Sequence, residues 1–281
     1  MPGNDGAPNG RHRISAQDRN GASAPSAMPA GTQSIHRVVM ILRELGARNR
    51  EGARLTELVQ SLKLEQPTAH RMLRSLVAES MATQDPETKR YFLGQAVYEL
   101  GLAAGNRFGL KSLCEPILSS LSSRTRDTTF LVVRSGDESV CLDRREGDSP
   151  VKIFTLAVGD RRPLGVGASG MALLSAYPES EVRRVIEANA ERLANYGERN
   201  PTRLIAHVLE AKERGYSVRD LPGYEGIRAI GMPVVDGQGR PLAAVSISTL
   251  TGRLTGENFD QRHRLLQQHC QAIGRAVSRP A

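Results

Sequence analysis

Polar side chains follow one face of a short predicted helix that begins at Gln66. Pro67 stands in its first turn, where a missing N–H costs little because that group has no partner within the helix. At about 100° per residue, one side carries apolar residues and the other carries donors and acceptors that suit base edges and phosphates. The polar set is Gln66, Thr68, His70, Arg71 and Arg74. This spacing predicts a helix that reads DNA, although an ordinary solvated face would look the same.

Two apolar helical patterns precede the polar helix and would hold it in place. The first begins at Ser34, a good N-cap residue, and is expected to end at Gly46; the second begins at Thr56. A corner at residues 63–65 separates the second pattern from the polar helix. Two short helices around a tight corner are typical of a helix-turn-helix.

A β-hairpin is expected directly after the polar helix. Residues 81–84 and 89–93 read as strands around the turn sequence of residues 85–88. Lys89 and Arg90 stand beside this turn, where two cations could contact DNA phosphates. A basic hairpin after a recognition helix is a wing, so residues 33–94 predict a winged helix-turn-helix.

The second half of the sequence mixes strand and helix patterns. Short runs rich in Val, Phe and Thr predict strands at 128–134, 139–143, 151–156, 227–235 and 242–248. Amphipathic patterns predict helices at 95–104, 110–124, 169–176, 180–188, 202–214 and 258–277. Adjacent antiparallel strands with helices grouped apart indicate an α+β fold.

Composition narrows the class of protein. The 281 residues include 38 Lys and Arg against 30 Asp and Glu, and this net charge of +8 favours a polyanionic partner. The three cysteines, Cys114, Cys141 and Cys270, show no CxxC spacing, which fits a reduced cytoplasm better than a disulfide scaffold. Neither the cysteines nor the histidines show a metal-ligand spacing, so no metal and no other cofactor is expected.

The first 32 residues predict a disordered tail. They are rich in Gly, Ala, Pro, Ser and Asn and have too few apolar residues to order themselves. They also lack the apolar stretch of a signal peptide, and no later stretch is long enough to cross a membrane. A cytoplasmic location without membrane contact is therefore expected.

A glycine-rich loop could bind an anion. Gly165, Gly167 and Gly170 spell GxGxxG at the start of a predicted helix, but the strand and acidic residue of a dinucleotide site are missing around them. A glycine turn at a helix N-terminus still exposes amides that suit a carboxylate or phosphate, although a tight packing turn would look the same. Ser246 and Ser248, two apart on one strand, face one side of it and suit a small polar ligand or, alternatively, solvent.

Five segments, in order, resemble the IclR family of bacterial transcription regulators. The runs "QSIHRVVMILREL" and "LTELVQSLKLEQPTAHRMLRSLVAESMATQDPETKRYFLG" resemble its DNA-binding domain. The runs "GDRRPLGVGASGMALLSA", "RGYSVRDLPGYEGIRAIGMPVVDGQGRPLAAVSIS" and "LTGRLT" resemble its effector-binding domain. The resemblance extends from residue 33 to the C-terminus.

The resemblance implies a division of the chain and a set of effector contacts. After the DNA-binding domain, it implies a linker helix at 95–109 and a GAF-like α/β effector-binding domain at 110–281. The implied effector contacts are Gly167, Ala168, Ser169, Asp220, Ala229, Ser246 and Ser248, with Phe154 as an apolar wall. The sequence departs from the family at Gly165, where His is common, and at Ala229, where several members have Cys.

These features together predict a ligand-responsive transcription regulator. The winged helix would bind a pseudo-palindromic double-stranded operator as a homodimer or, by resemblance, as a tetramer, and the C-terminal domain would sense a small organic acid. One alternative is a nonspecific DNA-organising protein. Another is a GAF-like thiol enzyme that uses Cys141, although no base or second thiol can be placed and GxSxG is absent, so no catalytic residues are expected.

Overall fold

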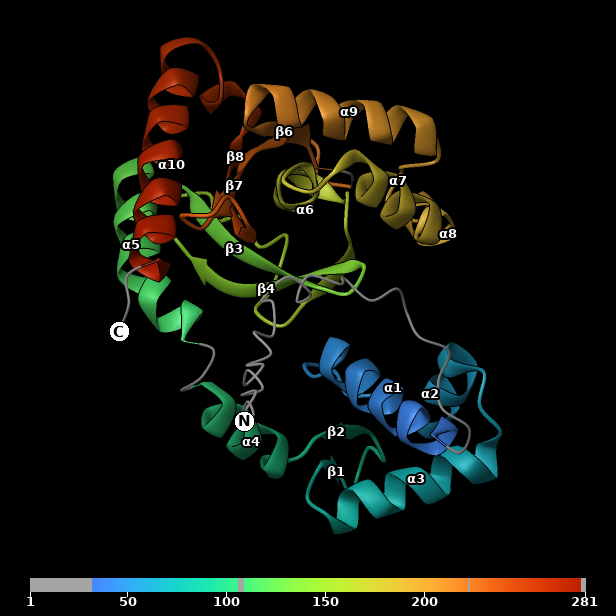
Figure 1. Ribbon diagram of the computed structural model, residues 1–281. Coiled ribbons are helices and arrows are strands. Elements are labelled where there is room, and N and C mark those ends of the chain that lie inside the picture. Colours follow the sequence, from blue (N-terminus) through green and yellow to red (C-terminus); the bar gives the residue numbers. More distant parts are fainter. Residues whose placement is uncertain (1–31, 106–108, 222, 279–281) are drawn as a thin grey trace, which may run out of the picture.

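The computed structural model describes residues 32–105, 109–221 and 223–278 (Figure 1). The tail predicted to be disordered lies outside these ranges except for its last residue, Thr32. Along the described chain, a small group of helices with a hairpin comes first, and a larger sheet with helices on both faces follows.

Three helices and a two-stranded hairpin form the N-terminal part. They are α1 (Gln33–Ala47), α2 (Leu55–Leu62), α3 (Gln66–Ala78), β1 (Ala82–Gln84) and β2 (Tyr91–Leu93). Leu45, Leu58 and Leu73, one from each helix, are fully buried in a core that also contains Tyr91 of the hairpin. The strands are antiparallel, with Gln84 opposite Tyr91. This arrangement confirms the predicted helix-turn-helix and its following hairpin.

Two of these helices begin and end differently from the prediction. Helix α1 begins one residue before Ser34, with Thr32 at its N-cap, and continues through Gly46. Helix α2 begins one residue before Thr56, and the Arg54 amide donates to Oε2 of Glu57 over 2.9 Å. A glutamate that bonds back to the preceding amide stabilises a helix start, so Thr56 is not needed as the cap.

A six-stranded antiparallel sheet forms the centre of the C-terminal part. Its strands are β3 (Thr128–Ser135), β4 (Glu138–Arg145), β5 (Arg161–Pro163), β6 (Ser217–Asp220), β7 (Ile227–Val235) and β8 (Pro241–Leu250). Their order across the sheet is β5-β4-β3-β8-β7-β6, and every neighbouring pair is antiparallel. Strands β3 and β8 are central, with Phe130 opposite Ser246.

Helices cover both faces of this sheet (Figure 1). The helices of the described chain after β2 are α4 (Gln95–Gly105), α5 (Leu110–Thr125), α6 (Gly167–Ser175), α7 (Glu179–Ala188), α8 (Ala190–Ala194), α9 (Pro201–Arg214) and α10 (Gly256–Val277), with a 3-10 turn η1 (Thr251–Arg253). Phe130 packs in the core beneath α6, α7 and α9, whereas Leu131 packs in the core beneath α5 and α10, because successive strand residues point to opposite faces. This architecture confirms the predicted α+β class with a GAF-like domain.

The strand predicted at residues 151–156 is wrong. Along this stretch the amide of Ile153 donates to the Thr128 hydroxyl over 3.4 Å, and just beyond it the amide of Ala157 donates to the Asp160 carboxylate over 2.7 Å. Side chains thus take bonds that a strand would give to its neighbour, and β5 pairs with β4 instead. The two short strands β5 and β6 and the short helix α8 were not predicted, because three to five residues are too few for a periodic pattern, whereas the turn sequence of residues 85–88 marks the equally short β1 and β2.

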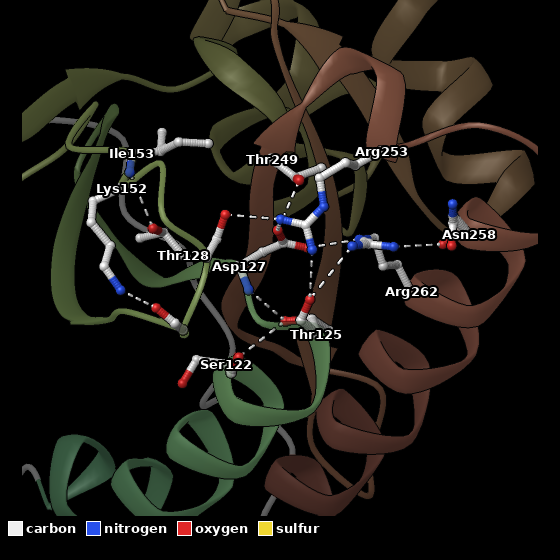
Figure 2. Close-up of polar contacts among 12 residues, drawn as sticks. Ser122, Thr125, Asp127, Thr128, Lys152, Ile153, Thr249, Arg253, Asn258 and Arg262 are labelled. Atoms are coloured by element: carbon white, nitrogen blue, oxygen red, sulfur yellow. Dashed lines mark hydrogen bonds and ion pairs between the residues drawn. The ribbon is translucent and has the colours of Figure 1, made fainter.

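A buried carboxylate joins four segments on the α10 side of the sheet. Asp127 lies in the connection between α5 and β3, and Figure 2 shows its side chain between Thr249, Arg253 and Arg262. It accepts hydrogen bonds from the Thr249 hydroxyl (2.8 Å) and from Nε of Arg262 (2.7 Å), and it pairs with Nη1 of Arg253 (2.8 Å). These partners come from β8, α10 and η1, so a single carboxylate fixes all three segments to the end of α5.

Candidate DNA-binding face and ligand pocket

The polar side chains predicted to read DNA lie along the outer face of α3. Gln66, His70, Arg71 and Arg74 are exposed and Thr68 is half-buried. The opposite side of α3 is buried in the N-terminal core through Ala69, Leu73 and Leu76. No carboxylate in the described ranges pairs with Arg71 or Arg74, so both guanidinium groups are available to an external polyanion.

The turn of the hairpin presents Lys89 in a strained but well-supported conformation. Lys89 is exposed and has φ of 57°, a left-handed conformation that is uncommon for a residue with a Cβ. Its amide donates to the Asp85 carbonyl over 3.0 Å. Oδ1 of Asp85 accepts hydrogen bonds from the Thr88 amide (2.6 Å) and the Thr88 hydroxyl (2.7 Å). The hydrogen bond from the Thr88 amide lowers the pKa of the Asp85 carboxyl. The turn therefore holds Lys89 outward.

Arg90 points inward from the same hairpin. Its Nη1 donates to the Gly52 carbonyl over 2.9 Å and lies 3.4 Å from Oε2 of Glu57. The Arg54 amide, assisted by Arg90, lowers the pKa of the Glu57 carboxyl. The Arg90 guanidinium is therefore bonded to groups at and just before the start of α2. Lys89 is instead exposed at the hairpin turn.

A small cavity of about 30 Å³ lies between the sheet and the start of α6. Six of the eight predicted effector contacts line it: Gly167, Ala168, Ser169, Ala229, Ser246 and Ser248. The wall also includes Phe130, Ser139, Thr155, Leu156, Arg162 and Leu221, which the sequence did not single out. Because the free volume admits only a few atoms, a larger ligand requires neighbouring side chains to move.

Close backbone contacts fix the start of α6 against the sheet. Gly165 and Gly167 have φ of 101° and 66°, which lets the chain turn from β5 into the helix. The Ala168 carbonyl accepts a 2.6 Å hydrogen bond from the Ser217 hydroxyl, and a Cβ on Gly231 would lie 2.5 Å from the same oxygen. Helical geometry leaves the first amides of α6 without partners inside the helix. They form the positive end of the helix beside the cavity.

Two buried hydroxyls face the cavity from β8. Ser246 and Ser248 are each only 3% exposed, and they lie on the same side of the strand. Neither hydroxyl has a hydrogen-bond partner within the part of the chain that the structure describes. Neither oxygen is among the fully enclosed unpartnered atoms of the described residues, so both hydroxyls are open to the cavity and can bond to a polar ligand there.

Two of the predicted effector contacts lie outside the cavity. The Phe154 side chain is 57% exposed, and its ring centroid lies 4.7 Å from Cζ of Arg144. Asp220 ends β6 with its carboxylate exposed and bonded to Nε of Arg228 over 2.6 Å, which lowers its pKa. The next residue, Leu221, lines the cavity in its place.

Arg162 lines the cavity, although it is not among the effector contacts predicted from the sequence. The pair Arg161–Arg162 stands just before the glycine loop, but the sequence did not show which of the two faces the cavity. In the structure, Nε of Arg161 donates to Glu138 over 2.6 Å, away from the cavity, whereas Arg162 lines it and donates to the Thr155 carbonyl.

The cysteines lack the properties of catalytic thiols. Burial raises the pKa of Cys141 to about 12 and that of Cys114 to about 12, and it also raises the pKa of Cys270. A thiol that stays protonated at neutral pH is a poor nucleophile.

Within residues 32–105, 109–221 and 223–278, no group of three His, Cys, Asp or Glu could hold a metal ion. In the same ranges, every helix is too short or too polar to cross a membrane.

Two family models match the chain. The model described as "Bacterial transcriptional regulator IclR C-terminal" matches residues 103–275, and the model described as "IclR helix-turn-helix domain" matches residues 34–86. The helix-turn-helix match comes first along the chain, as do the three helices and the hairpin of the structure, and the C-terminal match follows, as does the six-stranded sheet.

Relatives extend these matches over nearly the whole chain. The chain is 27% identical over 252 residues to the HTH-type transcriptional regulator XynR of Escherichia coli K12, covering 89% of this chain and 98% of that protein. It is 27% identical over 265 residues to the HTH-type transcriptional repressor AllR of Salmonella typhimurium LT2, covering 94% and 96%.

Solved structures show the same fold. An IclR-type regulator from Alicyclobacillus acidocaldarius superimposes with a TM-score of 0.73 at 25% identity, over 88% of this chain and 98% of that one. An IclR homologue from Microbacterium hydrocarbonoxydans, complexed with 4-hydroxybenzoate, superimposes with a TM-score of 0.69 at 20% identity, over 87% and 98%.

Proposed function

Because this chain belongs to the IclR family of bacterial transcriptional regulators, we propose that it is a regulator whose operator binding responds to a small organic acid. Helix α3 reads base edges through its exposed polar face, and Lys89 of the wing contacts the phosphate backbone. The C-terminal domain binds the acid in the cavity beside α6. Regulation follows when the acid binds the DNA-competent and the DNA-incompetent arrangements with unequal affinity.

The unpartnered hydroxyls of Ser246 and Ser248 are the observation that carries the sensing proposal. They face the same cavity as the first residues of α6, whose amides also need acceptors. A carboxylate accepts hydrogen bonds through two oxygens, and an organic acid adds polar or apolar atoms on its other side. Such a ligand satisfies donors from α6 and β8 at once. Phe154 and Asp220 have no part in this site.

A two-fold operator requires a two-fold protein, so we propose that the regulator is at least a dimer. The linker helix α4 supports this assembly because Tyr98, Leu100 and Leu102 are large apolar side chains that are exposed in the single chain. Light scattering at micromolar concentration should show a dimer or a larger oligomer, and a monomer with and without DNA contradicts the proposal. The protein acts where bacterial DNA lies, in the cytoplasm.

A thermal-shift screen of organic acids tests the sensing proposal. An acid at a hundred times its dissociation constant should stabilise the wild type by about 2.7 kcal/mol, seen as a higher melting temperature. Ser246→Leu fills the cavity and Ser169→Pro removes one amide, so both should abolish the shift while operator binding is kept. Ser180→Leu, at an exposed position of α7, is the matched control and should keep the shift.

Two results would refute this assignment. Either no acid stabilises the wild type, or the acids that do so stabilise Ser246→Leu equally. A footprint on operator DNA gives an independent check, because it should change when the stabilising acid is added. A nonspecific DNA-organising protein would give no such change.

A further inference from the structure

Arg162 places a positive charge at the cavity wall without a counter-charge. Its guanidinium is half-buried, donates to the neutral carbonyl of Thr155, and has Cζ 5.9 Å from the Tyr196 ring centroid. No carboxylate of the described residues lies within ion-pair distance of it. Its neighbour Arg161, in contrast, pairs with Glu138.

This arrangement leaves the charge of the Arg162 guanidinium unmatched by any carboxylate of the described residues. A guanidinium carries five N–H donors, and a partly buried charge that faces only neutral groups has lost hydration without gaining an opposite charge. A carboxylate in the cavity would replace a neutral acceptor by a charged one and would form shorter, stronger bonds to the guanidinium fork. The site therefore gains more from an anion than from a neutral ligand of the same shape.

The register of the sheet puts Arg162 on the same face as the serine hydroxyls. Arg162 pairs with Ser139 across β4 and β5, and the Ser139 hydroxyl donates to the Arg162 carbonyl over 3.3 Å. Ser139, Ser246 and Phe130 all line the cavity, and the glycine turn after β5 returns the chain to it as the start of α6. The cavity thus has two positive features, the helix end and the guanidinium.

We infer that Arg162 is the residue that makes this pocket select acids. Its guanidinium exchanges the Thr155 carbonyl for the effector's carboxylate, which accepts from the α6 amides through its remaining lone pairs. The pocket therefore prefers a carboxylic acid to the uncharged amide of the same shape. This inference rests on the proposed effector site and adds to it the charge that recognises the ligand.

Matched pairs of probes separate charge from shape. The acids 4-hydroxybenzoate, pyruvate and succinate are titrated beside 4-hydroxybenzamide, pyruvamide and succinamide into wild type, Arg162→Met and Arg162→Gln. Arg199→Met is the control, because Arg199 is exposed and has no ion pair within the described ranges. At least one acid should bind wild type more tightly than its amide. Both Arg162 variants should weaken that acid by about tenfold or more, and leave its amide unchanged.

The melting temperature without ligand distinguishes recognition from structure. Because Arg162 has no carboxylate partner, Arg162→Met should melt at or above the wild-type temperature. If both variants melt far below wild type, Arg162 is structural and the inference is overturned. If both bind the acid as tightly as wild type, the inference is overturned while the effector site stands. If no acid stabilises wild type, the effector site itself fails, and the inference with it.

Discussion

The carboxylate of Asp127 accepts a 2.7 Å hydrogen bond from Nε of Arg262, a residue 135 positions later in the sequence. Their side chains are 1% and 7% exposed, so this is a buried ion pair. Arg253 and Thr249 complete the coordination of the carboxylate (Figure 2). The pair joins the start of the sheet to the last helix.

Removal of the Asp127 charge should strongly destabilise the protein. In Asp127→Asn the Arg262 guanidinium stays buried with no opposite charge, and breaking a buried pair in this way costs roughly 3–5 kcal/mol. Urea denaturation measures the difference. Glu210→Gln, which breaks the exposed pair with Arg214, is the control and should cost less than about 1 kcal/mol. Equal denaturation midpoints for the two variants would contradict the prediction.

Acid should weaken the ion pairs of Glu181. Hydrogen bonds from Arg184, with Arg134 adding to them, lower the pKa of this carboxyl from 4.5 to about 2. Since the folded-state pKa is the lower one, the pairs contribute their full stability above about pH 4.5 and lose it as the pH falls towards 2. Glu181→Gln should therefore be less stable than wild type at pH 7, and the difference should vanish near pH 2.

Urea denaturation at a series of pH values tests this prediction. Glu187→Gln is the matched control on the same helix, because Glu187 is exposed and makes no ion pair in the described part of the chain. A Glu181→Gln difference that stays constant from pH 7 to pH 2 would mean that the carboxylate does not supply the stability.

Two substitutions should separate base reading from phosphate binding. Arg71→Ala should weaken operator binding by about 1–3 kcal/mol and reduce discrimination at one base pair. Lys89→Ala should weaken all DNA sequences alike and lower the salt slope by about one. Gel shifts at several salt concentrations measure both effects, with Arg199→Ala as a control for net charge. Unchanged affinity in both variants would remove α3 and the wing from the DNA interface.

Arg90 should affect DNA binding through the fold. In the structure it bonds to Gly52 and Glu57, so Arg90→Gln should lower the stability of the N-terminal part and leave the salt slope of DNA binding unchanged. A double-mutant cycle with Glu57→Gln should give a small favourable coupling, because both side chains are partly exposed. A lower salt slope in Arg90→Gln would restore the phosphate contact that the sequence predicted.

Long periodic patterns identified most elements of the fold. The prediction for β7 matches the structure at both ends, and α9 begins one residue before the predicted start. These elements bury one face along many residues, so their apolar residues recur in the sequence at the period of a helix or a strand. The stretch at 151–156 has strand-like composition but bonds to side chains, and composition alone does not reveal a bonding partner.

The pocket was predictable where a motif marked it. The glycine spacing predicts a turn at a helix start, and the two-residue spacing of the serines on β8 predicts that they face one side; both features line the cavity. Arg162 was missed because its role depends on the register between β4 and β5, which pairs residues 23 positions apart. The sequence offers two adjacent arginines, and only the fold shows that Arg161 has a carboxylate partner and Arg162 has none within the described ranges.

Selection of variants that bind a different small molecule would tolerate substitutions unequally at the two strands beside the cavity. On the β7 side, any Cβ at position 231 would collide with the Ala168 carbonyl, so a larger residue must push the strand away from α6. On the β8 side, Ser246 projects into the cavity, so a side chain of another size at this position does not require the backbone to move. A saturation library should therefore return glycine at position 231 from every selection, while the residues recovered at position 246 change with the small molecule used.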